Sequence, residues 1–329
     1  MHAAANNLRG GVSPRNTRLR GQSIIEYVLI IAIIGLVIVF AGPDVAGAIR
    51  NQFNLVGNTV NSGTTGGVEG GASGGGSAGT DSATFEAAVA KDAKDWTLGE
   101  QKAVAEDIAA KGEASSAWAK AKAAMDAGTE FSMKLTNGQT LAYRIIGMNH
   151  DNLADGSGKA GLTFLTTSTG TKSRMTATNS NVGGWEKSEI RQKMNSGEIW
   201  NLMPSDFQSK VKPVTKLTNN FGGGSESKTA AVTATSDKLF LLSHSEILGG
   251  GWGGYPWSFN EGTQYEAFEN KVTNMYSANP CLANGCTWWE RSVTQMNAWD
   301  FLHVEPNGNP STYDRGLSSN YYICPAWCF

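Results

Sequence analysis

The side chains best suited to catalysis form no familiar catalytic pattern in this sequence of 329 residues. The four histidines, His2, His150, His244 and His303, lie in no triad motif, and neither a phosphate-binding loop nor a dinucleotide-binding fingerprint occurs. Ser243 precedes His244, but neighbours on a strand point to opposite faces, so we do not expect these two side chains to meet. The sequence therefore predicts a protein that is not an enzyme and needs no cofactor.

Cysteines are the second chemically active group, and all four lie close to the end of the sequence. Clustered cysteines in even number are typical of disulfides formed in an oxidising compartment. Local pairing of Cys281 with Cys286 and of Cys324 with Cys328 is the simplest of three connectivities. Zinc is the rival, but the cysteines lack C-x-x-C spacing, so we expect no metal site.

An aromatic loop is the best candidate for ligand binding. The stretch "ILGGGWGGYPWSF" at 247–259 contains Trp252, Tyr255 and Trp257, whose flat faces suit a sugar ring or a protein partner. We favour the alternative that these rings fold back onto the core. Asp151 and Asp155 hint at calcium, but the rest of an EF-hand loop is missing and a turn is expected.

One carboxylate, Glu26, stands near the start of the long apolar run at 23–42. Arginines precede this run and predict a membrane segment whose N-terminus stays in the cytoplasm. A carboxylate within a bilayer costs roughly 2.5 kcal/mol or more, and neither a secretory signal peptide nor a plain anchor explains it. Cleavage between Gly21 and Gln22 would create an amine about 6 Å along a helix from Glu26. That amine could neutralise Glu26 of a neighbouring subunit and set the register of an assembly.

These residues resemble the prepilin signal of type IV filaments. A basic leader, Gly21, four residues, the pair Glu26-Tyr27 and an apolar run are similar to Flp (tight-adherence, Tad) pilins in particular. The resemblance implies cleavage after Gly21 by a prepilin peptidase and contacts with other pilin subunits through Glu26 and Tyr27. It also implies residence in the bacterial inner membrane before assembly, and then in an extracellular filament or at the cell surface. Typical Flp pilins end soon after the helix, so this longer chain is more like a minor pilin or a pseudopilin.

The sequence divides by composition. Glycine and serine dominate residues 61–82, which should form a flexible linker. Apolar residues recur at helical spacing in residues 83–128. We expect this segment to form a helical hairpin that packs on the head, residues 129–329. The expected parts are a leader at 1–21, a pilin-type helix at 22–60, a Gly/Ser-rich linker at 61–82, a helical spacer at 83–128 and a head at 129–329.

The head reads as α+β. Alternating apolar residues on both sides of Asn137-Gly138 predict a β-hairpin, and "GLTFLTTS" and "DKLFLLSHSEI" read as further strands. The stretch at 185–203 predicts a helix, and "YEAFENKVTNMY" predicts another. Ser205 or Asp206 should cap a helix in "SDFQSKVK". Strands interleaved with few helices and Gly-rich loops are typical of an α+β domain.

Three motifs of the head resemble a bacterial surface-domain family. They are "W-x-x-S-x-I-R" at 185–191, "WWERS" at 288–292 and the closing "YYICPAWCF", which departs from relatives at Cys324-Pro325, as "WWERS" does at Glu290. The resemblance implies a fold similar to the C-type lectin-like and formylglycine-generating-enzyme group. "WWERS" should be a core strand in which Arg291 pairs with an acid or with carbonyl groups. The expected fold class is thus a long N-terminal apolar pilin helix, a Gly-rich linker, a helical spacer and a C-type lectin-like α+β head.

The sequence predicts a pilin-like subunit whose head binds a glycan or a protein. The formal net charge is −2 and the chain beyond the basic leader is mildly acidic, which argues against a nucleic-acid partner. A pseudopilin that does not polymerise, or a membrane-anchored envelope binding protein, is the alternative. An enzymatic head related to formylglycine-generating enzymes is a third hypothesis, and it requires reactive cysteines.

Overall fold

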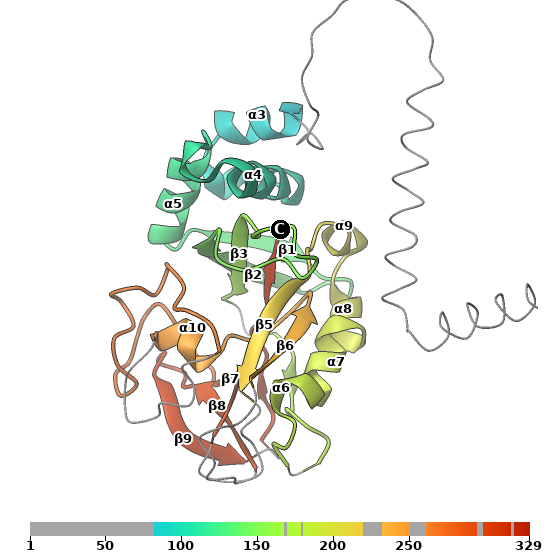
Figure 1. Cartoon of the computed structure of the whole chain (residues 1–329), viewed down its shortest axis with the longest axis vertical. Helices are drawn as coiled ribbons and strands as arrows, with labels where there is room; N and C mark the ends of the chain where they lie inside the picture. Colours follow the sequence, from blue (N-terminus) through green and yellow to red (C-terminus); the bar gives the residue numbers. More distant parts are fainter. Residues whose placement is uncertain are drawn as a thin grey trace, which may run out of the picture. The chain divides into compact units, whose positions relative to one another are not determined.

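The computed structural model describes the body of the chain, which falls within the unit Gly76–Phe329. Helices and three β-sheets make up this unit (Figure 1). The described residues are 82–167, 170–178, 180–219, 232–249, 261–294, 299–316 and 319–329.

Helices lead into the first sheet. The α4 helix begins with a capping box, in which the Thr97 hydroxyl accepts a bond from the Glu100 amide and the Glu100 carboxylate accepts one from the Thr97 amide. The α5 helix ends just before Gly128, whose φ of +64° suits glycine and stops the helix. The segment predicted to be helical is therefore confirmed. Its elements are α3 (Ser82–Ala90), η1 (Ala93–Asp95), α4 (Leu98–Lys111), η2 (Gly112–Ala114) and α5 (Trp118–Asp126).

A four-stranded sheet follows the helices, in the order β1-β2-β3-β11. The predicted hairpin at Asn137-Gly138 is confirmed, because β1 and β2 pair antiparallel on both sides of this turn. The last strand of the chain, β11, pairs antiparallel with β3. Helix α4 approaches β3 so closely that a Cβ atom at Gly161 would overlap the carbonyl group of Ala105. The strands are β1 (Glu130–Lys134), β2 (Thr140–Met148), β3 (Leu162–Thr166) and β11 (Ala326–Cys328).

Two further sheets and several short helices complete the described body. A five-stranded sheet has the order β4-β10-β7-β8-β9, and β5 pairs antiparallel with β6. In Figure 1, the short helices α6 to α9 run beside β5 and β6. The strands are β4 (Lys172–Ser173), β5 (Val214–Asn219), β6 (Val232–Asp237), β7 (Trp288–Val293), β8 (Asp300–Val304), β9 (Pro310–Gly316) and β10 (Tyr321–Tyr322). The helices are α6 (Gly184–Lys187), α7 (Glu189–Asn195), α8 (Glu198–Leu202), α9 (Ser205–Gln208) and α10 (His244–Leu248).

Aromatic side chains join the C-terminus to the centre of the body. The rings of Phe164 and Trp327 stack with centroids 5.9 Å apart, and Tyr143 meets Trp327 edge-on at 4.9 Å. Phe207 and Phe329 pack in the same group, with centroids 5.9 Å apart. All five are buried, so the last residues of the chain are part of the hydrophobic core rather than a free tail.

Three local predictions are wrong. The stretch "DKLFLLSHSEI" is not a strand, because β6 ends at Asp237 and α10 begins at His244. Of the residues between them, 239–243 are buried, and Phe240 forms an isolated bridge to Ala326. The stretch from Tyr265 forms turns instead of a helix. Neither Ser205 nor Asp206 caps α9, which follows Pro204 with no side-chain cap.

The expected fold class also needs correction. The longest described helix, α4, has 14 residues, and none of the described helices has the length and apolarity needed to cross a bilayer. The expected apolar helix at 22–60 lies outside the described residues. Helices α4 and α5 bury their apolar side chains in the same core as the sheets, in agreement with the expectation that this segment packs on the head. The described chain is an α+β body of mixed helices and sheets.

Candidate functional site

The "WWERS" motif forms a buried strand at the centre of the body, as predicted. Every residue of β7 is buried, and Arg291 is 0% exposed. The Arg291 guanidinium forms a bidentate ion pair with Glu246, and one of its two contacts is 2.9 Å long. It also donates to the carbonyl oxygens of Leu217, Leu241 and Glu261. The expectation that Arg291 pairs with an acid or with carbonyls is confirmed on both counts.

A second buried cation, Lys216, extends this ion pair into a cluster. Its Nζ atom lies 2.6 Å from Asp151 and 2.5 Å from Glu246. The Asp151 carboxylate also accepts hydrogen bonds from the Tyr265 hydroxyl at 3.0 Å and from the Thr163 hydroxyl at 2.7 Å. All of these side chains are at most 4% exposed. The cluster therefore links several distant segments of the chain inside the core.

The balance of charges in this buried charge cluster (Asp151, Lys216, Glu246, Glu261 and Arg291) explains which of its carboxyl groups is protonated. Its two cations, Lys216 and Arg291, match the two carboxylates of Asp151 and Glu246, whereas Glu261 is a third buried carboxyl group. Burial would raise the pKa of Asp151 and of Glu246, but the adjacent cations hold both below their usual values. For Glu261 burial prevails over the charge of Arg291 and raises the pKa to about 7. The surplus carboxyl group thus keeps its proton in mildly acidic solution, and the cluster is neutral.

Hydrogen bonds fix Glu261 in this neutral environment. One carboxyl oxygen accepts from the Asn219 backbone amide at 3.0 Å, and the other is bonded to the Ser292 hydroxyl. The Ser292 oxygen also accepts from the backbone amide of His244. Because these groups are buried and engaged with one another, the cluster is suited to holding the fold together rather than to meeting a substrate.

His150 lies at the edge of the cluster. Its ring stacks on Tyr265 with centroids 4.1 Å apart, and its Nδ1 atom lies 3.0 Å from Glu266. Burial disfavours the charged imidazolium, but the carboxylates of Glu266 and Asp151 outweigh it and raise the pKa of His150. A charged imidazolium at this position adds one more cation beside Asp151.

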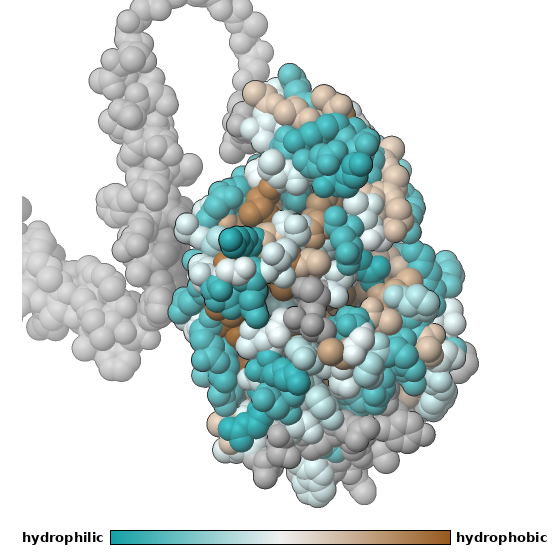
Figure 2. Space-filling view, turned by 180° about the vertical axis from the view of Figure 1, so that it is seen from behind, coloured by the Kyte–Doolittle hydropathy of each residue, from teal (hydrophilic) through white to brown (hydrophobic). Residues whose placement is uncertain are grey.

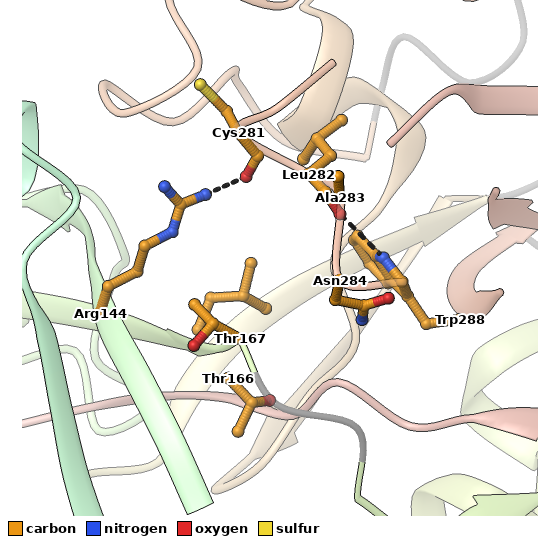
Figure 3. Close-up of a pocket in the computed structure, with 9 residues that line it drawn as sticks. Arg144, Thr166, Thr167, Cys281, Leu282, Ala283, Asn284 and Trp288 are labelled. Carbon is orange, nitrogen blue, oxygen red and sulfur yellow. Dashed lines mark hydrogen bonds between the residues drawn. The ribbon is translucent and has the colours of Figure 1, made fainter. Parts of the chain in front are cut away.

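The surface offers a different kind of site, a polar pocket beside β2. Two adjoining hollows of about 20 Å³ and 360 Å³ share Arg144, Thr167, Cys281 and Ala283. The smaller has room for about one water molecule, and the larger falls within the size range of small-molecule sites. In Figure 3, Arg144 reaches from β2 toward the Cys281 carbonyl group. Asn284 lies across the pocket from Arg144 in the same view.

Arg144 is the chemically distinctive residue of this pocket. Its guanidinium donates to the Cys281 carbonyl oxygen and lies over the Phe268 ring, 5.8 Å from the centroid. Its Nε atom is buried and has no hydrogen-bond partner among the described residues, none of which forms an ion pair with Arg144. Burial lowers the pKa of Arg144, opposed by Cys281 and Glu130 nearby. The side chain remains a cation whose charge is only partly compensated.

The four cysteines are free thiols in the structure. Cys328 is buried beside Asp151 and Thr163, with its sulfur 3.3 Å from the Thr163 hydroxyl. Cys324 instead accepts a bond from the Asn284 side chain at 3.1 Å. The two sulfurs thus contact different parts of the core, and the expected local disulfides do not form here. Cys281 and Cys286 are half-buried.

Only some of the residues that were expected to carry function lie in the described part of the chain. The cleavage and assembly residues Gly21, Gln22, Glu26 and Tyr27 lie outside the described part of the chain, as does the aromatic loop with Trp252, Tyr255 and Trp257. Asp151 belongs to the buried charge cluster. Asp155 accepts bonds from the amide and hydroxyl of Ser157 in an exposed turn. Ser243 and His244 have separate partners, since the Ser243 hydroxyl donates to the Glu261 carbonyl and the His244 ring meets Glu290.

The sequence does not single out Arg144, because an arginine inside a predicted strand reads as an exposed side chain. Its pocket forms only when β2 lies beside the loop at 280–284, which is distant in the sequence. A cation on an otherwise apolar strand was the one available signal. The face of the molecule seen from behind in Figure 2 is mainly hydrophilic where it is coloured, with hydrophobic residues in small areas between polar ones.

The fold and site together define an α+β domain with a buried charge cluster and a polar surface pocket. A protein-family model for a domain of unknown function, DUF6273, matches residues 160–328. This match covers just over half of the chain, and the protein belongs to the DUF6273 family. No curated protein and no solved structure matches the chain.

Proposed function

We propose that this protein is a pilin-like subunit of a bacterial type IV/Tad filament, and that its folded body is displayed outside the cell as a binding module. A prepilin peptidase cleaves it after Gly21. The mature chain then packs with other pilin subunits through Glu26 and Tyr27. The observation that carries this proposal is the ordered coincidence of a basic leader, Gly21, the pair Glu26-Tyr27 and a long apolar run.

The described body supports the binding part of this proposal. The "WWERS" motif, which resembles a surface-domain family, forms a buried strand and contributes Arg291 to the buried charge cluster. Such a cluster favours a unique packing of the body and leaves contacts with other molecules to the surface. The polar pocket at Arg144 is the surface feature best suited to such contacts.

Processing is tested by mass spectrometry of the chain from cells with and without an active prepilin peptidase. We expect the mature chain to begin at Gln22 only where the peptidase is active, and Gly21→Leu to retain the leader. A chain that keeps its leader in the presence of the active enzyme contradicts the proposal.

A second experiment distinguishes this proposal from its alternative, a pseudopilin or envelope binding protein that does not polymerise. Glu26→Gln removes the carboxylate that is proposed to set the register, so we expect processing to continue while incorporation into filaments is lost. Glu69→Gln, in the Gly-rich stretch, is the matched control and should leave incorporation unchanged. Unimpaired incorporation of the Glu26 variant, or its absence in the unaltered chain, favours the alternative.

A further inference from the structure

The pocket at Arg144 is assembled from segments that are far apart in the sequence. Gly128 and Glu130 come from the end of α5 and the start of β1, Arg144 comes from β2, and Thr167 follows β3. The loop that includes Lys271 and Cys281 closes the opposite side. A pocket of about 360 Å³ formed in this way is positioned by the sheet and does not depend on a single loop.

Cations mark one part of this pocket. The Arg144 guanidinium has donors beyond the one that bonds to the Cys281 carbonyl oxygen, because arginine carries five N–H groups. Lys271 lies on the rim, and its ammonium group forms no ion pair with the part of the chain that the structure describes. Arginine binds carboxylates through two parallel hydrogen bonds, so a carboxylate is the group best matched to this part.

Carboxylates line another part of the same pocket. Glu130 stands opposite Arg144 in the register of β1 and β2, and it accepts a bond from the Thr167 hydroxyl at 2.5 Å. Asp126 lies 2.7 Å from Lys122 on the outside of α5. The exposed Glu130 carboxylate retains acceptor capacity, because an ionised carboxylate has about four acceptor sites.

The lining therefore presents both signs of charge: Arg144 and Lys271 as cations, and Glu130 as the carboxylate that remains once Asp126 is paired with Lys122. A ligand with a single sign of charge would complement either Arg144 or Glu130 alone, whereas a ligand that carries both charges complements both. We propose that this pocket binds a compact zwitterion, an amino-carboxylate whose carboxylate meets Arg144 and whose ammonium group meets Glu130. The inference rests on the proposed function in that it takes the folded body to be a binding module.

Ligand-observed NMR titration of the purified full-length chain tests this assignment. The probes are alanine and alanyl-alanine, which represent a free amino acid and a short peptide. Galacturonate supplies a carboxylate without an ammonium group, and alanine amide supplies an ammonium group without a carboxylate. We expect at least one of the two zwitterions to bind at least tenfold more tightly than galacturonate and alanine amide, since each of the latter loses one charge-assisted contact.

Two variants locate the binding. Arg144→Gln should weaken binding at least tenfold, and Ala283→Trp should block the pocket from an exposed position without altering Arg144. Arg174→Gln removes an exposed arginine away from the pocket and should change nothing. If the Arg144 variant does not fold, the Ala283 variant decides the question.

Some results would overturn the assignment. They are binding of neither zwitterion, equal binding of galacturonate, or undiminished binding in Ala283→Trp. Because these titrations do not depend on cleavage after Gly21, failure here leaves the proposed processing and assembly intact. Conversely, a retained leader contradicts the proposed pilin-like role without affecting the pocket.

Discussion

Replacing Glu261 by glutamine should make the protein more stable in mildly alkaline solution and should have little effect in mildly acidic solution. Glu261 is 1% exposed, and its carboxyl group is the surplus acid of the buried charge cluster. Burial raises its pKa from 4.5 to about 7. Glutamine can reproduce the protonated acid, because its oxygen can accept from the Asn219 amide and its nitrogen can donate to the Ser292 hydroxyl.

The magnitude follows from this pKa difference. In the unfolded chain Glu261 loses its proton near pH 4.5, whereas in the folded protein it keeps the proton to about pH 7. Between these values the folded state binds more protons, so its stability falls as the pH rises. The full loss, reached above pH 7, is about 3 kcal/mol. Glutamine does not ionise, so Glu261→Gln should recover most of this loss at pH 8.

Thermal unfolding followed by circular dichroism at pH 5 and pH 8 measures the effect. About 3 kcal/mol corresponds to a rise in melting temperature of about 6–12 °C in a domain of this size at pH 8. The raised pKa of His150 also makes stability fall as the pH rises, but this contribution is common to both proteins and cancels in the difference. Glu113→Gln alters an exposed glutamate and serves as the control. Equal destabilisation of Glu261→Gln at both pH values would refute the reasoning.

Two other predictions concern stability and thiol accessibility. Lys216→Met should destabilise the body by about 3–5 kcal/mol in urea unfolding, because Asp151 and Glu246 lose a buried partner. The exposed Lys134→Met should be nearly neutral, and an equally small loss in both variants would contradict the role assigned to the buried charge cluster. In the folded protein, an alkylating reagent should modify two thiols rapidly and two only after unfolding, as mass spectrometry can determine. The rapid pair is Cys281 and Cys286, and the slow pair is Cys324 and Cys328, whose pKa values are raised by burial.

Local patterns in the sequence predict elements whose stabilising contacts are themselves local. The hairpin at Asn137-Gly138 needs only a tight turn and two alternating strands. In contrast, "DKLFLLSHSEI" has the composition of a strand but forms no continuous ladder. Its apolar residues are buried around one bridge between Phe240 and Ala326. Burial without a neighbouring strand gives the same hydrophobic pattern as a strand, so the pattern alone cannot separate the two.

The candidate site was harder to predict, because it depends on contacts between distant residues. Asp151 reads as part of a polar turn, yet it forms an ion pair with Lys216, 65 residues further along the chain. The partner of Arg291 was predicted in kind, as an acid or carbonyl groups. That this partner is Glu246 depends on how α10 packs against β7. The spacing of residues along the sequence contains no information about such packing.

The folded body of this chain extends beyond the region that matches DUF6273. That region begins at residue 160, whereas β1 and β2, which extend its sheet through β3, come before it. Asp151 also precedes it, so the matched region alone would leave Lys216 without one of its two carboxylate partners in the core. Arg144 lies on β2 as well, while Thr167, Lys271 and Cys281 lie within the match. The matched region therefore supplies one side of the pocket. The preceding segment supplies Arg144, the charged group that we expect to determine which ligand binds. A change at Arg144 should alter the ligand without altering the framework of the domain.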